Sequence, residues 1–336
     1  MLKGLKSQLA AAKSITVLGH HNADPDAICS MIAFNNLYTS INPEGQVVFV
    51  CDDISRVAKQ VMETFGSSIE VLTSIDHDSD LIVLLDANSK YQLGPDLEQM
   101  LDFPEKTIVI DHHEENPDIG NIADFVMVRS DRFSTCEIIV DLFRSLNIEI
   151  SSKTANLLLT GMLYDTRRFY YADKDTINAA LHLIDVGAEY ATCIESLIIR
   201  PDRSERIARL KAAGRLRLNV IGDWILATSK IGAYEASACR GIIDLGADVA
   251  IIGGKPAKGV VRLSSRSTSE FSKETGINLG TDVMEPLGAL IGGEGGGHAN
   301  AAGANGHQNL DEALNRSVEL IREIIEKQDR SNQVSQ

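Results

Sequence analysis

The stretch SITVLGHHNADPDAICSMIAFNNLY, residues 14–38, decides the fold of the first half of the chain. It opens on an apolar run of strand length, Ser14–Gly19, and closes on a stretch that predicts a helix, Ala27–Tyr38. Polar residues between the two include His20, Asp24 and Asp26. A strand that passes through a polar loop into a helix is the opening of a βαβ unit, so this stretch favours an α/β fold.

The residues that follow repeat this alternation of strand and helix. Further strands are expected at Val47–Cys51, Leu81–Asp86 and Thr107–Asp111, and helices at Ile54–Phe65, Ser134–Leu146 and Ser152–Tyr164. Such alternation predicts a doubly wound, mostly parallel sheet with helices on both faces. We expect it to form an N-terminal domain over residues 1–190.

The second half predicts a smaller C-terminal α/β domain over residues 216–326. A helical linker, residues 191–215, is expected before it and a polar tail, residues 327–336, after it, with the active site in the cleft between the domains. In the C-terminal domain we expect strands at Asn219–Ser229, Asp248–Gly253 and Gly259–Ser265 and helices at Ala233–Leu245 and Leu310–Glu326. We also expect a glycine-rich turn at Gly292–Gly297 that leads into a small-residue helix or turn.

Composition narrows the class of protein. The longest apolar runs are strand-sized, well short of the roughly 20 residues of a membrane helix. The five cysteines are scattered without a C-x-x-C pair, which argues against a disulfide framework and a thiolate zinc site, so we expect a cytoplasmic protein. The net charge of −15 makes a small phosphate ligand easier to hold than a long duplex, although a local positive groove survives in an acidic protein.

Acidic residues and histidines gather where ligands bind in such folds. Ligand sites of open α/β sheets lie beyond the C-terminal ends of the strands. Four segments deliver side chains to that edge, namely His20 to Asp26, Asp86, Asp111-His112-His113 and Asp165. Carboxylates crowded in this way repel one another unless a cation neutralises them. Mixed imidazole and carboxylate ligands suit Mn²⁺, with Mg²⁺ or Co²⁺ as substitutes. Two such ions about 3.5–4 Å apart could activate a water and stabilise both oxygens of a phosphoryl displacement.

Each of these residues also has an ordinary structural explanation. Asp24 or Asp26 could cap the helix that follows, Asp86 could be a turn residue, and Asp165 could fall at a helix end by chance. His112-His113 could be no more than the polar end of a strand. The coincidence of four segments is what favours a metal cluster.

The pattern His20-x-x-x-Asp24-x-Asp26-Ala27, then Asp86, Asp111-His112-His113 and Asp165-Thr166, resembles the four motifs of the DHH phosphoesterase superfamily. Later, Gly295-Gly296-Gly297-His298-x-x-Ala301-Ala302-Gly303 resembles the signature of the DHH-associated C-terminal domain. The chain is most similar to the compact NrnA-like branch of oligoribonucleases and phosphoadenosine-phosphate phosphatases, and RecJ exonucleases have a related core.

The resemblance implies roles for individual residues. His20, Asp24 and Asp86 would hold one Mn²⁺, and Asp26, Asp86, His112 and Asp165 the second, with Asp86 bridging. His113 would contact the scissile phosphate, and Asp111 would orient the neighbouring histidine. In the second domain the resemblance implies substrate binding by Arg262, Arg266, His298 and the glycines Gly295, Gly296 and Gly297. Relatives usually have glycine at the position of Arg167, so the arginines here, Arg168 among them, could narrow the site or add a phosphate contact.

The expected activity is Mn²⁺-dependent, two-metal exonucleolytic hydrolysis of short single-stranded RNA or DNA to mononucleotides. Alternatives with the same centre are a phosphatase for 3′-phosphoadenosine 5′-phosphate and a phosphodiesterase for cyclic or linear dinucleotides. An inorganic pyrophosphatase ranks lower, because that enzyme lacks the Gly-Gly-Gly-His signature. A non-catalytic component of a replication or repair complex ranks lowest, because every expected ligand is present. A homodimer and a helicase or replisome partner stay open.

Overall fold

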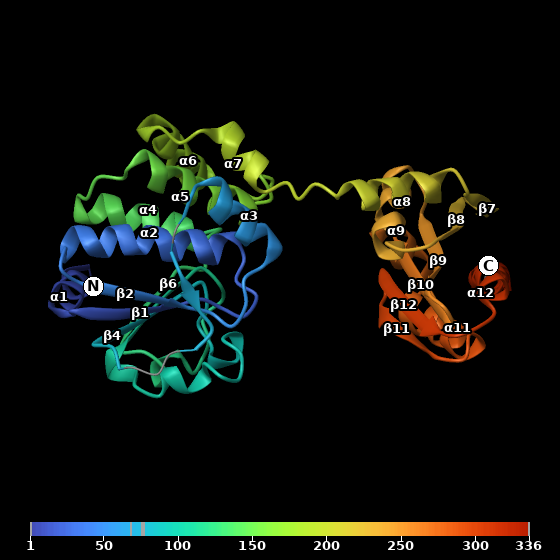
Figure 1. The fold of residues 1–336 in the computed structure, drawn as a ribbon, viewed down its shortest axis with the longest axis horizontal. Helices are drawn as coiled ribbons and strands as arrows, with labels where there is room; N and C mark the ends of the chain where they lie inside the picture. The colour runs from blue at the N-terminus through green and yellow to red at the C-terminus, as the bar shows by residue number, and fades with distance from the viewer. Residues whose placement is uncertain (1, 68, 75–77, 335–336) are drawn as a thin grey trace. The chain divides into compact units, whose positions relative to one another are not determined.

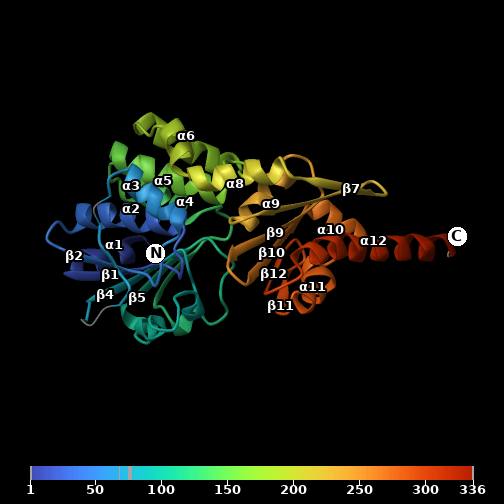
Figure 2. The same ribbon diagram turned by 45° about the vertical axis from the view of Figure 1, so that its right-hand side comes forward.

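The computed structural model describes residues 2–67, 69–74 and 78–334. Its internal contacts divide the chain into two compact units, Met1–Ile199 and Arg200–Gln336, each of which can be followed in Figures 1 and 2. Among the described residues, no helix combines the length and the apolar character needed to cross a membrane. The predicted site in a cleft between the domains stays a prediction.

A six-stranded parallel sheet forms the centre of the first unit. The strand order is β3-β2-β1-β4-β5-β6, and every pairing is parallel. The central strand β4 is buried along its whole length, as expected when both faces of a parallel sheet are covered. The strands are β1 (Ser14–Leu18), β2 (Gln46–Val50), β3 (Val71–Leu72), β4 (Leu81–Leu85), β5 (Thr107–Asp111) and β6 (Phe125–Val128).

The two faces of this sheet are covered differently. One face carries the large apolar core under the helices α1 (Leu2–Ala11), α2 (Pro25–Ile41), α3 (Arg56–Thr64), α4 (Thr135–Leu146), α5 (Ser152–Asp165), α6 (Lys174–Val186) and α7 (Tyr190–Ser196). The other face carries a smaller core that includes Leu93, Leu97 and Leu101. Its cover consists of short 3₁₀ turns, η1 (Lys90–Gln92), η2 (Glu98–Leu101), η3 (Pro104–Lys106) and η4 (Ile119–Asn121). Gly94 and Pro95 interrupt this leucine spacing, so no α-helix forms there.

A mixed sheet organises the second unit. Its order is β11-β12-β10-β9-β8-β7, with β8 and β9 parallel and the other pairs antiparallel. The strands are β7 (Arg217–Ile221), β8 (Trp224–Ile231), β9 (Val249–Ala257), β10 (Val260–Ser267), β11 (Glu294–His298) and β12 (Ala301–Gly306). The helices are α8 (Arg203–Ala213), α9 (Glu235–Asp244), α10 (Ser269–Thr275), α11 (Glu285–Leu290) and α12 (Leu310–Val334), with a π-helix, η5 (Leu279–Met284).

Some local expectations were wrong. The glycine-rich segment forms strand β11 and the small residues after it form β12, where a turn and a helix or turn were expected. The expected strand Asn219–Ser229 is a hairpin of β7 and β8 that turns at Gly222, with φ 58°. The bounds of the domains and of the linker stay a prediction; α7 lies in the first compact unit, and α8 packs on α9 in the second. Helix α12 continues past Glu326 to Val334.

Candidate functional site

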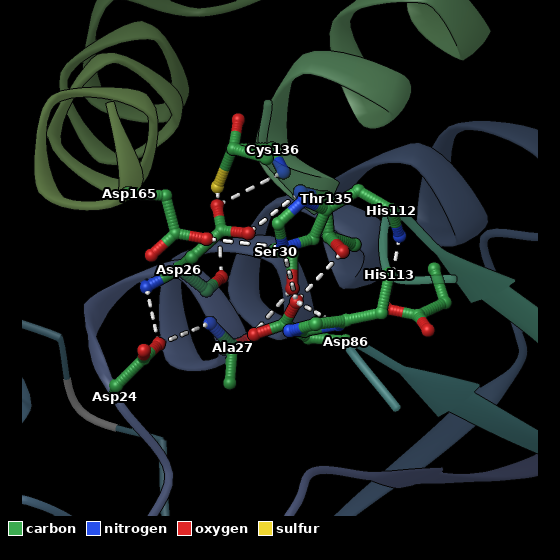
Figure 3. A network of polar contacts seen from close by, with 12 residues as sticks. Asp24, Asp26, Ala27, Ser30, Asp86, His112, His113, Thr135, Cys136 and Asp165 are labelled. Atoms are coloured by element: carbon green, nitrogen blue, oxygen red, sulfur yellow. Dashed lines mark hydrogen bonds and ion pairs between the residues drawn. The ribbon is translucent and has the colours of Figure 1, made fainter. Parts of the chain in front are cut away.

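Three neighbouring strands end at the same edge of the parallel sheet and present the predicted ligands. β1 is followed by His20, β4 by Asp86, and β5 ends on Asp111, followed by His112 and His113. The chain runs outward in opposite directions from β1 and β4, which are adjacent. A crevice at such a reversal is the usual ligand site of an open α/β sheet. Figure 3 shows the carboxylates and imidazoles converging at this point.

The loop after β1 is fixed by the start of α2. Asp24 is the N-cap residue, and its Oδ1 accepts hydrogen bonds from the backbone N–H of Asp26 (2.9 Å) and of Ala27 (3.1 Å). Its Oδ1 also lies 3.9 Å from His20 Nε2. Asp24 therefore caps helix α2 and at the same time belongs to the cluster of acids and histidines.

Asp26 is fully buried and held by the N-terminus of another helix. Its carboxylate accepts hydrogen bonds from the backbone N–H of Thr135 (2.6 Å) and of Cys136 (3.0 Å), in the first turn of α4. Burial, reinforced by the charges of Asp86 and Asp165, raises the pKa of Asp26 well above its usual value. The N–H groups at a helix N-terminus favour the charged form of a carboxylate. Here burial and the neighbouring negative charges outweigh that effect.

Asp86 lies at the centre of the cluster in a strained backbone conformation. It has a φ of 61° and is 1% exposed. Its Oδ1 accepts a hydrogen bond from Thr135 Oγ1 at 2.9 Å, and its two oxygens lie 3.7 Å from His20 Nε2 and 3.5 Å from His112 Nε2. Burial, with the nearby charges of Asp24 and Asp165, raises the pKa of Asp86 to about 7. Strain held at a buried carboxylate of this kind marks functional sites.

Asp165, the last residue of α5, brings a carboxylate from the helical layer. Its Oδ2 lies 3.1 Å from His112 Nε2. Burial lowers the pKa of His112, but the close carboxylate of Asp165 and the charges of Asp26 and Asp86 outweigh it and raise the pKa to about 10. His20 follows the same balance between burial and the effects of Asp24 and Asp86, and its pKa rises to about 9.

Asp111 stands apart from the other acids. Its Oδ1 accepts hydrogen bonds from the backbone N–H of His112 (2.9 Å) and from His113 Nδ1 (2.8 Å), and its Oδ2 accepts one from Asn88 Nδ2 (2.6 Å). Asp111 therefore fixes the ring of His113 through Nδ1. The hydrogen bond to Asp111 also raises the pKa of His113.

The cluster offers three overlapping sets of metal ligands. Within each set, one ligand atom per residue lies within 4.8 Å of the others, and Asp86 is common to all three. The sets are His20, Asp24 and Asp86; Asp26, Asp86, His112 and Asp165; and Asp86, His112 and His113. The first two coincide with the two ligand sets implied by the sequence motifs.

The surroundings of the histidines suit a divalent cation. His112 Nε2 is buried and, among the described residues, has no hydrogen-bond partner that satisfies it. His20 Nδ1 is hydrogen-bonded to the His21 carbonyl at 2.8 Å, which directs its Nε2 towards Asp24 and Asp86. Metal-bound histidines characteristically donate their second ring N–H to such an acceptor. The donor set therefore fits Mn²⁺ or a similar ion.

Four residues that support this site were not predicted from the sequence. Thr135 and Cys136 hold Asp26, Asn88 holds Asp111, and a Cβ on Gly161 would lie 2.8 Å from Asp26 Oδ1. The N-cap at Ser134 was an available signal, since it announces a helix N-terminus whose free N–H groups can hold an anion. Asn88 and Gly161 carry no local signal.

The structure brings the predicted substrate-binding residues of the second unit onto one sheet face. Arg266 pairs with Ala301, which pairs with His298, and Arg262 pairs with Asn305, which pairs with Glu294. Paired residues point to the same face, so Arg262, Arg266 and His298 share it. Between them Ser264, Gly303 and Gly296 form a row that contains two glycines, and a Cβ on Gly296 would meet open space.

Three other predicted substrate-binding residues, Gly295, Gly297 and Arg168, lie in different surroundings. A Cβ on Gly295 would strike the backbone carbonyl of Met284, and one on Gly297 would lie 2.7 Å from Ala302 Cα, so close packing requires both glycines. Arg168 is exposed and follows α5 directly after Thr166 and Arg167.

Comparison with known proteins gives matches to both units. The model of the DHH family, N-terminal domain, matches residues 14–162, and that of the DHHA1 domain matches residues 233–327. An uncharacterized protein of Methanocaldococcus jannaschii is 29% identical over 314 residues, which cover 93% of this chain and 92% of that protein. The bifunctional oligoribonuclease and PAP phosphatase NrnA of Thermus thermophilus is 27% identical over 318 residues, covering 93% and 90%. An exopolyphosphatase-related protein from Bacteroides fragilis has the same fold, with a TM-score of 0.63 at 18% identity and coverage of 97% and 95%.

Proposed function

Because the chain belongs to the DHH family of phosphoesterases and carries a DHHA1 domain, we propose that it is a Mn²⁺-dependent exonuclease that hydrolyses short single-stranded oligonucleotides to mononucleotides. The observation that carries the proposal is the set of ligand groups that share Asp86. The similarity to a bifunctional oligoribonuclease supports the choice of substrate.

In this proposal His20, Asp24 and Asp86 hold one ion, and Asp26, Asp86, His112 and Asp165 hold the other. Bound Mn²⁺ supplies a water of lowered pKa and neutralises charge on the phosphate. The protein's own part is to hold these ligands in place through the N-terminus of α4 and the N-cap of α2.

His113 is proposed to bind the scissile phosphate. Its Nδ1 is held by Asp111, and its Nε2 is the proposed donor to the phosphate. A protonated ring provides a charge-assisted hydrogen bond, and the raised pKa of His113 favours that form. Asp111 acts by positioning this ring.

The second unit is proposed to bind the nucleotide that is released. Arg262 and Arg266 bring guanidinium groups to its sheet face, and the glycine row lets a ligand approach the backbone closely. Arg168 is proposed as a further phosphate contact.

Two alternatives use the same centre, namely a phosphatase for 3′-phosphoadenosine 5′-phosphate and a phosphodiesterase for cyclic or linear dinucleotides. The first is favoured by the second activity in the name of the Thermus relative. A role as a component of a replication or repair complex, with or without a helicase partner, is the alternative of another class.

The deciding experiment is Mn²⁺-dependent hydrolysis of an end-labelled RNA ladder from dinucleotides to long oligomers, with a DNA ladder, phosphoadenosine phosphate and pyrophosphate in parallel. Stepwise release of mononucleotides from the short oligomers is expected. Phosphate release from phosphoadenosine phosphate alone would replace the exonuclease with the phosphatase. Absence of hydrolysis in every lane, with Mn²⁺ bound, would contradict both.

A further inference from the structure

The segment directly after Asp165, residues 167–171, has an unusual backbone; we call it the Arg-Tyr turn. Arg167, Arg168 and Phe169 have φ values of 48°, 60° and 65°. This left-handed conformation brings Cβ close to the following carbonyl oxygen, so residues other than glycine adopt it singly and rarely. Three successive residues in this conformation indicate that the positions of their side chains serve a function.

The turn is firmly held. The backbone N–H of Arg168 donates to Leu163 O at 2.7 Å, that of Tyr171 to Thr166 O at 3.0 Å, and that of Phe169 to Thr166 Oγ1 at 2.9 Å. Phe169 packs against the main core of the first unit and stacks on Tyr190, with ring centroids 6.5 Å apart. The strained backbone is therefore a fixed feature with one anchored ring.

The other side chains of the turn are exposed. Tyr170 is 78% exposed and Tyr171 45%, and both arginines are exposed. The Tyr170 and Tyr171 rings contact edge to face with centroids 4.9 Å apart, and the Arg167 guanidinium lies 5.3 Å from the Tyr171 centroid. The turn thus presents two aromatic rings and two cations in a chain of net charge −15.

This surface lies next to the candidate metal centre. The hydrogen bond from Tyr171 N–H returns the chain to Thr166, the residue after Asp165, whose carboxylate is 3.1 Å from His112 Nε2. The turn therefore begins two residues after a candidate metal ligand, and a backbone hydrogen bond ties its end to the residue next to that ligand.

Exposed rings beside arginines match the chemistry of single-stranded nucleic acid. Bases stack on aromatic side chains irrespective of sequence, and guanidinium groups bind the phosphates between them. Inorganic pyrophosphate and polyphosphate offer no ring to stack. We propose that the Arg-Tyr turn is a nucleobase-stacking subsite, with Tyr170 and Tyr171 as its platform, that selects single-stranded oligonucleotides over phosphate compounds without bases. The proposal rests on the proposed function and specifies its substrate class.

The first test compares a labelled pentaadenylate with an abasic pentamer of equal phosphate number. Binding of each to the full chain is measured by fluorescence anisotropy in EDTA, so that turnover plays no part. The wild type is expected to bind pentaadenylate more tightly. Tyr170→Ala and Tyr171→Ala should each weaken that binding roughly tenfold to a hundredfold and leave binding of the abasic pentamer unchanged. Equal binding of the two ligands by the wild type would overturn the subsite.

Two control variants separate stacking from general damage. Tyr170→Phe keeps the ring and should bind pentaadenylate as the wild type does. Phe103→Ala removes another exposed ring with a cation near it, Lys106 Nζ at 5.8 Å, but this ring precedes β5 at the opposite edge of the sheet. It should change neither ligand's affinity. An equal loss in Phe103→Ala and Tyr171→Ala would overturn the proposal.

A third variant tests why the strain is kept. Arg167→Gly removes the unfavourable side chain from a left-handed position, so the melting temperature should rise. Affinity for pentaadenylate should nevertheless fall, because the phosphate contact and the support of the Tyr171 ring are lost. A higher melting temperature with unchanged affinity would contradict a binding role for the turn.

The outcomes also separate this proposal from the proposed function. Base-dependent binding that Tyr170→Ala abolishes, in a protein that hydrolyses no oligonucleotide with Mn²⁺, would support the subsite and contradict the exonuclease. Hydrolysis of pentaadenylate and the abasic pentamer with the same KM would contradict the stacking subsite and support the proposed nuclease activity.

Discussion

At Asp86 the requirements of folding stability and of metal binding are opposed. Its carboxylate is buried, strained and surrounded by other acids, and its pKa is raised to about 7. An acid whose pKa is raised in the folded state destabilises the fold at every pH above its unfolded value near 4, and the cost is complete above 7. The position is therefore poor for stability and suitable for a bridging metal ligand.

We expect Asp86→Asn to lower Mn²⁺-dependent hydrolysis roughly a thousandfold or more, because both ions lose a ligand. The metal-free variant should melt at a higher temperature than the wild type at pH 8, since asparagine tolerates the positive φ and carries no charge. Activity assays and thermal unfolding in EDTA measure the two effects. Wild-type activity, or a lower melting temperature in EDTA, would count against this account. Asp80→Asn, an exposed acid before β4, should be fully active.

Metal binding should release protons. The pKa values of His20 and His112, about 9 and about 10, mean that both rings are protonated in the metal-free protein at pH 7. Since a metal must displace these protons, the apparent affinity for Mn²⁺ should rise as pH increases from 7 towards 9. Titration calorimetry in two buffers of different ionisation enthalpy counts the protons released. An affinity that stays constant over this range would show that the rings are not ligands.

At the scale of elements, the site depends on where three helices meet. α2 carries Asp26, α4 offers its N-terminal N–H groups to it, and α5 passes close enough that Gly161 lies against both. The polar cluster is therefore built into helix packing as well as into strand ends.

Gly161→Ala tests this packing. A methyl group there would press on Cys136 Sγ and lie 2.8 Å from Asp26 Oδ1. The expected cost is about 1–3 kcal/mol of unfolding free energy from overpacking, together with weaker Mn²⁺ binding. Denaturant unfolding measures the first and calorimetry the second. In contrast, Gly4→Ala in α1 meets open space and should be neutral or stabilising. If both substitutions behave alike, α5 does not constrain Asp26.

Elements also show what the sequence could predict. The strands β1, β4 and β5 and the helix after β1 follow from apolar runs and an Asp N-cap, and the six predicted metal ligands follow from motifs. The hydrogen bond from Thr135 to Asp26 joins residues 109 positions apart, and no local pattern announces it. The glycine strand β11 opposes local propensity, because its glycines are selected by close contact with Met284 and Ala302.

At the scale of the whole molecule, the two units have separate cores. Apolar clusters of the first unit contain only residues before 200, and those of the second only residues after it. Every candidate metal ligand found among the described residues lies in the first unit, while the sheet face with Arg262, Arg266 and the glycine row belongs to the second.

A fragment of residues 1–199 should therefore fold cooperatively and bind Mn²⁺ as the full chain does. Its hydrolysis of oligonucleotides should be strongly impaired through KM, because Arg262, Arg266 and the glycine row are absent. Thermal unfolding, metal titration and steady-state kinetics test the three statements. A fragment that folds but binds no Mn²⁺ would show that the second unit contributes ligands, contrary to this account.

Anomalous diffraction from crystals grown with Mn²⁺, collected at the manganese absorption edge, would locate the metal ions relative to Asp86. We expect two peaks per chain near Asp86, one beside His20 and Asp24 and the other beside Asp26, His112 and Asp165. A single peak, or peaks away from Asp86 in crystals that contain Mn²⁺, would contradict this expectation.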